Sequence, residues 1–192
     1  MAQGVDYSFD RPSPEAIKEA GYSFAGRYLA PNRAKALSKA EADLLIRAGL
    51  DIFCVWQAYG DWEHDLSGGR DQGIVHAQQA AQQLRECGGP AESPIYFAVD
   101  FDAQKAQLPT VGRYFQGVAQ VLGVHRTGAY GGINTLKFLF DQHLISYGWQ
   151  TYAWSRGKWD PRAQLRQVEM GKVDNAAVDF NVAQNADFGQ WH

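Results

Sequence analysis

The sequence is poor in cysteine, in excess charge and in long apolar runs. Two cysteines among 192 residues exclude a fold that depends on a disulfide framework, and we expect Cys54 and Cys87 to be free thiols. A formal net charge of −3 argues against a nucleic-acid partner, because such proteins gather positive charge on one face. No stretch is long and apolar enough for a membrane span, and no signal-peptide pattern is visible. We therefore expect a protein that is made in the cytoplasm and does not span a membrane, with a monomer as the default state.

The sequence also lacks the common signatures of cofactor, metal and nucleophile sites. No Gly-x-Gly-x-x-Gly turn follows the first predicted strand, which argues against a dinucleotide cofactor. Residues 61–65, with Asp71 and His76, have the side-chain types that bind metals, but their spacing matches no zinc or calcium site. No Ser-His-Asp or Cys-His arrangement is visible. We expect neither a metal ion nor a cofactor.

Strand and helix patterns alternate along the chain. Apolar runs of strand length, rich in β-branched and aromatic residues, alternate with segments that carry helix-capping signals. One such signal is the capping-box spacing of Ser38 and Glu41, with Gly49 ending the same helix. The predicted strands cover residues 4–9, 23–30, 51–57, 94–102, 126–132, 149–155, 163–169 and 177–182, and the predicted helices 13–20, 38–48, 69–87, 109–122 and 133–144.

This alternation predicts an α/β fold of parallel βα units. A single (β/α)8 TIM-type barrel over residues 1–192 fits best, although the chain is short for that fold. The last strand candidates follow one another closely, so we expect short or missing helices in the last third. A doubly wound open sheet is the alternative, and the missing glycine-rich turn counts against it.

The run from Pro94 to Asp102 ends in two acids and is the most informative segment. It has the apolar, β-branched and aromatic character of a buried strand. Alternation along a strand would point Asp100 and Asp102 to the same face, with Cβ atoms about 6–7 Å apart. A carboxylate pair of this kind raises the pKa of one member, as general acid catalysis requires. The alternative is that the two acids cap the next helix or are solvated.

Polar and aromatic residues recur where the predicted strands end. Functional groups of a (β/α)8 barrel come from the carboxyl ends of its strands. Acids ringed by aromatic and amide side chains are typical of carbohydrate-processing sites. Six Trp and nine Tyr are compatible with a sugar-binding groove, although a large core would use them too. The candidates are the acids Asp6, Asp100, Asp102 and Asp179, with Arg27, Trp56, Gln57, Tyr130, Trp154 and Gln167 as substrate-binding residues.

Several of these candidates have a structural alternative. A buried guanidinium needs a carboxylate partner, and we expect Asp6 to pair with Arg27 in an ion pair that also lines the pocket. The side chains of Trp56, Gln57, Tyr130 and Trp154 could hold a sugar or could belong to the core.

Four segments carry a resemblance to a known family. They are residues 4–12 (Gly-Val-Asp-Tyr-Ser-Phe-Asp-Arg-Pro), 26–29 (Gly-Arg-Tyr-Leu), 94–102 (Pro-Ile-Tyr-Phe-Ala-Val-Asp-Phe-Asp) and 178–181 (Val-Asp-Phe-Asn). The chain resembles, over essentially its whole length, the glycoside-hydrolase-like TIM-barrel family long labelled a domain of unknown function. That family is related to the family 25 lysozymes, which are N-acetylmuramidases that cut peptidoglycan.

The resemblance implies roles for the acids. The family 25 lysozymes have an Asp on strand one, matched by Asp6, an Asp-x-Glu signature on strand four, matched by Asp100 and Asp102, and a late Asp, matched by Asp179. Asp102 would then be the general acid, and Asp100 would stabilise the charged transition state or orient the N-acetyl group of the substrate. Asp6 and Asp179 would hold the sugar and tune the acidity of the donor.

One departure from the lysozyme pattern keeps two functions open. Asp102 stands where the lysozymes have Glu, and a displacement of about 1 Å in a catalytic group can cost about a hundredfold in rate. The first hypothesis is a peptidoglycan hydrolase, in which Asp102→Asn abolishes turnover. The second is a glycan-binding barrel that has lost hydrolysis, in which Trp154→Ala or Trp56→Ala abolishes binding. An enzyme acting on the cell wall would need phage-type release or non-classical export. The third hypothesis is a barrel that only docks a partner, which would neither cleave nor bind glycan.

Overall fold

The computed structural model describes residues 1–192, apart from the side chain of Glu63. That side chain belongs to the acidic segment considered above and lies outside the described residues. The strands are β1 (Gln3–Tyr7), β2 (Phe24–Leu29), β3 (Asp51–Trp56), β4 (Ile95–Ala98), β5 (Thr127–Gly131), β6 (Tyr147–Thr151), β7 (Leu165–Val173) and β8 (Ala176–Ala183). The helices are α1 (Pro14–Glu19), α2 (Lys39–Arg47), α3 (Trp62–Asp65), α4 (Gly69–Glu86), α5 (Leu108–Leu122), the 3₁₀ turn η1 (Val124–Arg126) and α6 (Ile133–Asp141).

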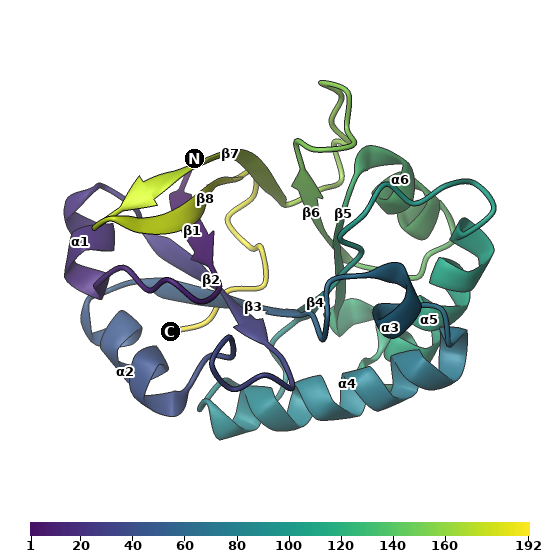
Figure 1. Ribbon diagram of the computed structural model, residues 1–192, viewed down its shortest axis with the longest axis horizontal. Coiled ribbons are helices and arrows are strands. Elements are labelled where there is room, and N and C mark those ends of the chain that lie inside the picture. The colour runs from purple at the N-terminus through teal and green to yellow at the C-terminus, as the bar shows by residue number, and fades with distance from the viewer.

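The eight strands close into a barrel in the order of the sequence, with the helices outside it (Figure 1). The predicted α/β barrel is therefore confirmed. No helix follows α6 in the part of the chain that the structure describes, as the close spacing of the last strands predicted. None of the helices among the described residues has the length and apolarity to cross a membrane.

The last strand corrects the expectation that all strands are parallel. Strands β1 to β7 pair in parallel with their neighbours, but β8 is antiparallel to both β7 and β1. The physical reason is the connection between β7 and β8, which consists of Asp174 and Asn175 with φ of 52° and 61°. Two consecutive left-handed residues form a tight hairpin turn, and a two-residue turn can join only antiparallel strands.

Apolar side chains fill the barrel below the site and also join its strands to the helices. Inside the barrel, Phe53 makes ring contacts with Phe24, Tyr96 and Trp149. The C-terminal segment closes that end of the barrel, where the Tyr96 hydroxyl donates to the carbonyl of Phe188 at 2.7 Å. Both cysteines are buried and free, as expected. Because apolar rings occupy the lower part of the barrel, polar side chains are left to the carboxyl ends of the strands.

Candidate active site at the mouth of the barrel

Six of the predicted site residues lie in the interior at the carboxyl end of the barrel, four on strands and two just after β3 and β4. They are Asp6, Gln57, Asp100, Tyr130, Gln167 and Asp179, and each of the six is hydrogen-bonded to another member of the set. Gly26 makes room for the Phe53 ring and for the first acid, because a Cβ at Gly26 would overlap Cζ of Phe53 and lie 2.9 Å from the Cβ of Asp6. The interior at this end of the barrel therefore holds three carboxyl groups.

The side chain of Gln167 is hydrogen-bonded to four other side chains at the site. Its Nε2 donates to Oδ2 of Asp6 at 3.1 Å and to Oδ2 of Asp179 at 3.2 Å. Its Oε1 accepts from the hydroxyls of Tyr130 at 2.8 Å and Thr151 at 2.9 Å. Because the two hydroxyls hold the amide oxygen, the amide nitrogen is left to face the two acids.

Asn181 completes the contacts of Asp6 and received no role in the sequence analysis. Its Nδ2 donates to Oδ2 of Asp6 at 2.8 Å, and its Oδ1 accepts from the indole nitrogen of Trp149 at 2.7 Å. The signal was available, because Asn181 lies two residues after Asp179 on one strand and so shares its face.

Burial raises the pKa of all three interior acids. Burial and the neighbouring Asp179 raise the pKa of Asp6 to about 7, although Asn181 and Gln167 oppose the rise. Burial and the charge of Asp100 raise the pKa of Asp179 to about 6. Burial also raises the pKa of Asp100, against the hydrogen bond from Gln57 and the charge of Lys35. The site can therefore hold a proton near neutral pH.

The mouth opens into a hollow of about 210 Å³ beside the β7–β8 hairpin. Asp6, Tyr28 and Asp179 line it from the barrel, and Met170 and Gly171 from the hairpin. Oδ1 of Asp6 is buried and has no hydrogen-bond partner among the described residues. An unpaired buried oxygen is less costly when it carries a proton than when it is charged, which agrees with the raised pKa of Asp6.

We expect Asp6→Asn to stabilise the protein near neutral pH. Between about pH 4 and pH 7 the Asp6 carboxyl keeps its proton in the folded protein and loses it in the unfolded chain. The free energy of unfolding therefore falls as pH rises through this range. Asparagine keeps the shape without titrating, and the gain at pH 7 should be on the order of 2 kcal/mol. Urea unfolding of both proteins at pH 4, 5, 6 and 7 measures it. Equal differences between the two proteins at all four pH values would contradict the raised pKa.

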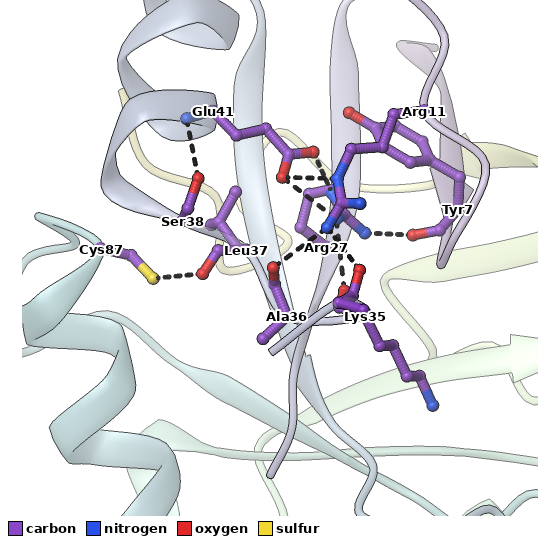
Figure 2. Close-up of polar contacts among 10 residues, drawn as sticks. Tyr7, Arg11, Arg27, Lys35, Ala36, Leu37, Ser38, Glu41 and Cys87 are labelled. Carbon is purple, nitrogen blue, oxygen red and sulfur yellow. Dashed lines mark hydrogen bonds and ion pairs between the residues drawn. The ribbon is translucent and has the colours of Figure 1, made fainter. Parts of the chain in front are cut away.

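Arg27 and Trp56 do not belong to this site, which corrects two predictions. Both point outward from the barrel, on the face opposite to Asp6 and Gln57. The carboxylate partner of Arg27 is Glu41 at 2.7 Å, not Asp6, and Figure 2 shows the pair beside Tyr7 and Arg11. Trp56 is buried against His76, with ring centroids 5.4 Å apart. Both side chains therefore pack in the layer between the strands and the helices.

Asp102 and Trp154 lie in loops at the mouth end of the barrel. Strand β4 ends at Ala98, so Asp100 and Asp102 follow the strand, which corrects the expected strand over residues 94–102. Asp100 is half-buried and faces Gln57, whereas Asp102 is exposed. Trp154 is half-buried in the loop after β6 and has the unusual φ of 56°.

Comparison with known proteins agrees with this geometry. A family model described as "Rv2525c-like, glycoside hydrolase-like domain" matches residues 15–186. The "Putative peptidoglycan hydrolase Rv2525c" of Mycobacterium tuberculosis is 31% identical over 97% of this chain and 82% of its own length.

Solved structures extend the comparison to the fold. The crystal structure of the Tat-secreted M. tuberculosis protein Rv2525c in complex with L-tartrate superposes with a TM-score of 0.94 at 29% identity, covering 100% of this chain and 99% of the other. A glycosyl hydrolase 25 of Streptococcus pneumoniae superposes with a TM-score of 0.64 at 15% identity, over 97% and 88% of the two chains, and so shares the fold. The chain belongs to the family of Rv2525c-like, glycoside hydrolase-like domains.

Proposed function

We propose that this protein hydrolyses glycosidic bonds in an amino-sugar polymer of the peptidoglycan type. The observation that carries the proposal is the group of three carboxyls, Asp6, Asp100 and Asp179, at the mouth of a barrel of this family, each with a raised pKa. Paired acids in different environments are the usual machinery of glycoside hydrolysis. The name of the M. tuberculosis relative suggests the same class of substrate.

Asp102 is the proposed proton donor. It is exposed on the loop that follows β4, so a polymer lying across the mouth can bring its glycosidic oxygen to this carboxyl. Asp6 is only 1% exposed and cannot reach an oxygen at the rim.

The interior acids have supporting roles in this proposal. Asp100 is held by Gln57 at 2.8 Å and faces the mouth, where its charge would stabilise the positive charge that develops on the sugar. Asp6 and Asp179 share the amide of Gln167; Asp179 would bind sugar hydroxyls, and the buried Asp6 beside it would tune the acidity of the site. One proton between them would keep these two neighbouring acids from repelling each other.

Trp154 is the proposed stacking surface for a sugar ring. A bulky residue at positive φ is strained, and such strain is concentrated at functional sites. We expect Trp154→Ala to weaken the binding of glycan oligosaccharides about tenfold, as loss of a central aromatic contact does. Isothermal titration calorimetry measures the effect, with Asp102→Asn present in every protein compared so that the oligosaccharide is not cleaved. Trp159→Ala is the control, because Trp159 lies in the same loop but stacks on Arg166 at 4.9 Å; an equal loss in both variants would contradict the assignment.

Fragment release tests the proposed reaction. Purified peptidoglycan and chitin-type oligosaccharides are incubated with the protein, and new fragments are identified by mass spectrometry. New reducing ends from one of these polymers support a hydrolase and identify the bond. Glycan binding without fragments would replace the proposal with a glycan-binding barrel, a candidate favoured by the shorter Asp102 in place of the lysozyme Glu.

We propose that the protein acts at the cell wall, because a polymer of the peptidoglycan type lies there. The M. tuberculosis relative is described as Tat-secreted, and a wall polymer is reached only outside the membrane. Fractionation of producing cells, with detection of the protein in the wall and culture fractions, tests this proposal. Protein confined to the cytoplasmic fraction would contradict it.

A further inference from the structure

Lys35 is a buried cation next to the site, and no sequence pattern pointed to it. Its side chain is 8% exposed, and it comes from the loop between β2 and α2, not from a strand. Its Nζ donates to Oε1 of Gln57 and lies 4.3 Å from the centre of the Tyr28 ring. Lysine is almost never buried without a role for its charge.

Gln57 links Lys35 to Asp100 through a second hydrogen bond. Lysine has only donors, so the oxygen of the Gln57 amide must face it. The amide nitrogen then faces Asp100 and donates to its Oδ2 at 2.8 Å. Because an amide NH₂ can only donate, the contact requires Asp100 to accept, which a charged carboxylate does best.

We infer that Lys35 is a positioning residue for Asp100, acting through the amide of Gln57. The inference rests on the proposed function, in which Asp100 must stay charged while a proton is delivered from elsewhere. Lys35 fixes the direction of the amide, and the amide fixes the rotamer and the charge of the carboxyl.

The loop that carries Lys35 is held from outside the barrel. Nη2 of Arg11 donates to the carbonyls of Ala34 at 2.8 Å and Ala36 at 3.2 Å, and Nη2 of Arg27 donates to the carbonyl of Lys35 at 3.4 Å. The thiol of Cys87 contacts the carbonyl of Leu37 at 2.9 Å. Figure 2 shows these anchors, with the side chain of Lys35 pointing away from them. The outer ion pair of Arg27 and Glu41 therefore also places the ammonium group of Lys35 at the mouth.

Other charged and titratable groups face Asp100 and enter the test. Asp65 raises the pKa of Asp100 from α3, and the charge of Asp100 in turn raises the pKa of Tyr28, Tyr130 and Asp179. Lys35 is the positive charge that lowers the pKa of Asp100, and the pKa of Lys35 is itself lowered by burial. A change at Lys35 should therefore act on Asp100 in a predictable direction.

The test is the titration of the Asp100 carboxyl by carbon-13 NMR in the free protein. Lys35→Met keeps the length of the side chain and removes the charge, so the amide of Gln57 can turn its oxygen toward Asp100. We expect the pKa of Asp100 to rise by about 1, as loss of a nearby opposite charge does. Lys35→Arg should restore most of the wild-type value. The matched control is Lys39→Met, which removes an exposed lysine paired with Asp43 and should leave Asp100 unchanged.

An unchanged titration of Asp100 in Lys35→Met, compared with Lys39→Met, would overturn the inference. If Lys35→Met does not fold, Lys35→Gln carries the same prediction and the same contrary outcome. The titration needs no substrate, so a wild type without hydrolysis would end the proposed function and still leave this result decisive. Where hydrolysis is measured, the acidic limb of the rate profile should move to higher pH in Lys35→Met by the same amount as the Asp100 titration.

Discussion

Asp102→Asn is expected to slow peptidoglycan cleavage by a factor of about 10² to 10⁴, which is the usual contribution of a general acid. The amide has the shape of the carboxyl but cannot give a proton to the leaving oxygen. Asp102 is exposed in a loop, so the substitution should leave the fold intact. The rate of release of new reducing ends, at saturating polymer and near pH 6, measures the loss.

Two further variants serve as controls for the Asp102→Asn measurement. Asp71→Asn removes an exposed acid from the first turn of α4 and should cleave as the wild type does. Asp179→Asn should retain measurable turnover with a changed pH profile, because Asp179 supports the site and does not deliver the proton. If Asp179→Asn were inactive while Asp102→Asn was not, the proton donor would be Asp179, whose pKa is about 6.

Glu41→Ala is expected to lower the free energy of unfolding by about 3–5 kcal/mol, the usual cost of leaving a buried charge without its partner. Arg27 is 0% exposed, and Glu41 holds it through both carboxylate oxygens at 2.7 and 3.2 Å. The rest of the Arg27 guanidinium contacts the Tyr7 ring at 4.3 Å and the Tyr7 carbonyl, which carry no negative charge, so its charge is balanced by Glu41.

Urea unfolding of wild type and Glu41→Ala at pH 7 measures this difference. The control is Glu86→Ala, which removes the partner of the exposed Arg33 and should leave the free energy of unfolding unchanged within error. Equal small losses in the two variants would contradict the importance of the buried pair.

The Glu41 effect should also depend on pH. Burial would raise the pKa of Glu41, but the hydrogen bond and charge of Arg27, with those of Arg11, lower it overall. A lowered pKa stabilises the fold fully above the unfolded-state value and loses that contribution as pH falls through the folded-state value. The gap between wild type and Glu41→Ala should therefore narrow on acidification below about pH 4.

The barrel could be predicted from the sequence because its strands and helices alternate with clear signals. The capping box at Ser38 is an example, since the Ser38 hydroxyl accepts from the Glu41 amide at 3.2 Å. The antiparallel β8 was missed because the turn residues Asp174 and Asn175 are ordinary loop residues until their left-handed backbone is seen.

The misplacement of Arg27 and Trp56 has one physical origin, which is strand parity. Every residue of β2 is buried or half-buried, so its two faces look alike in the sequence, and a shift of one residue exchanges them. Tyr28 and Gln57 face the interior, whereas their neighbours Arg27 and Trp56 face the helices. Lys35 could not be found at all, because its place in the site depends on a loop that other residues hold.

The mass of the fragments released from purified peptidoglycan is the measurement that tests the central claim most directly. Hydrolysis adds one water to each broken glycosidic bond, so the account predicts new fragments that end in a free reducing sugar. Wild type should release them, Asp71→Asn should do so at the same rate, and Asp102→Asn should nearly fail to do so. Folded wild-type protein that binds the polymer and releases no fragment, or fragments that end in anhydro sugars without added water, would contradict the claim that this barrel is a glycoside hydrolase.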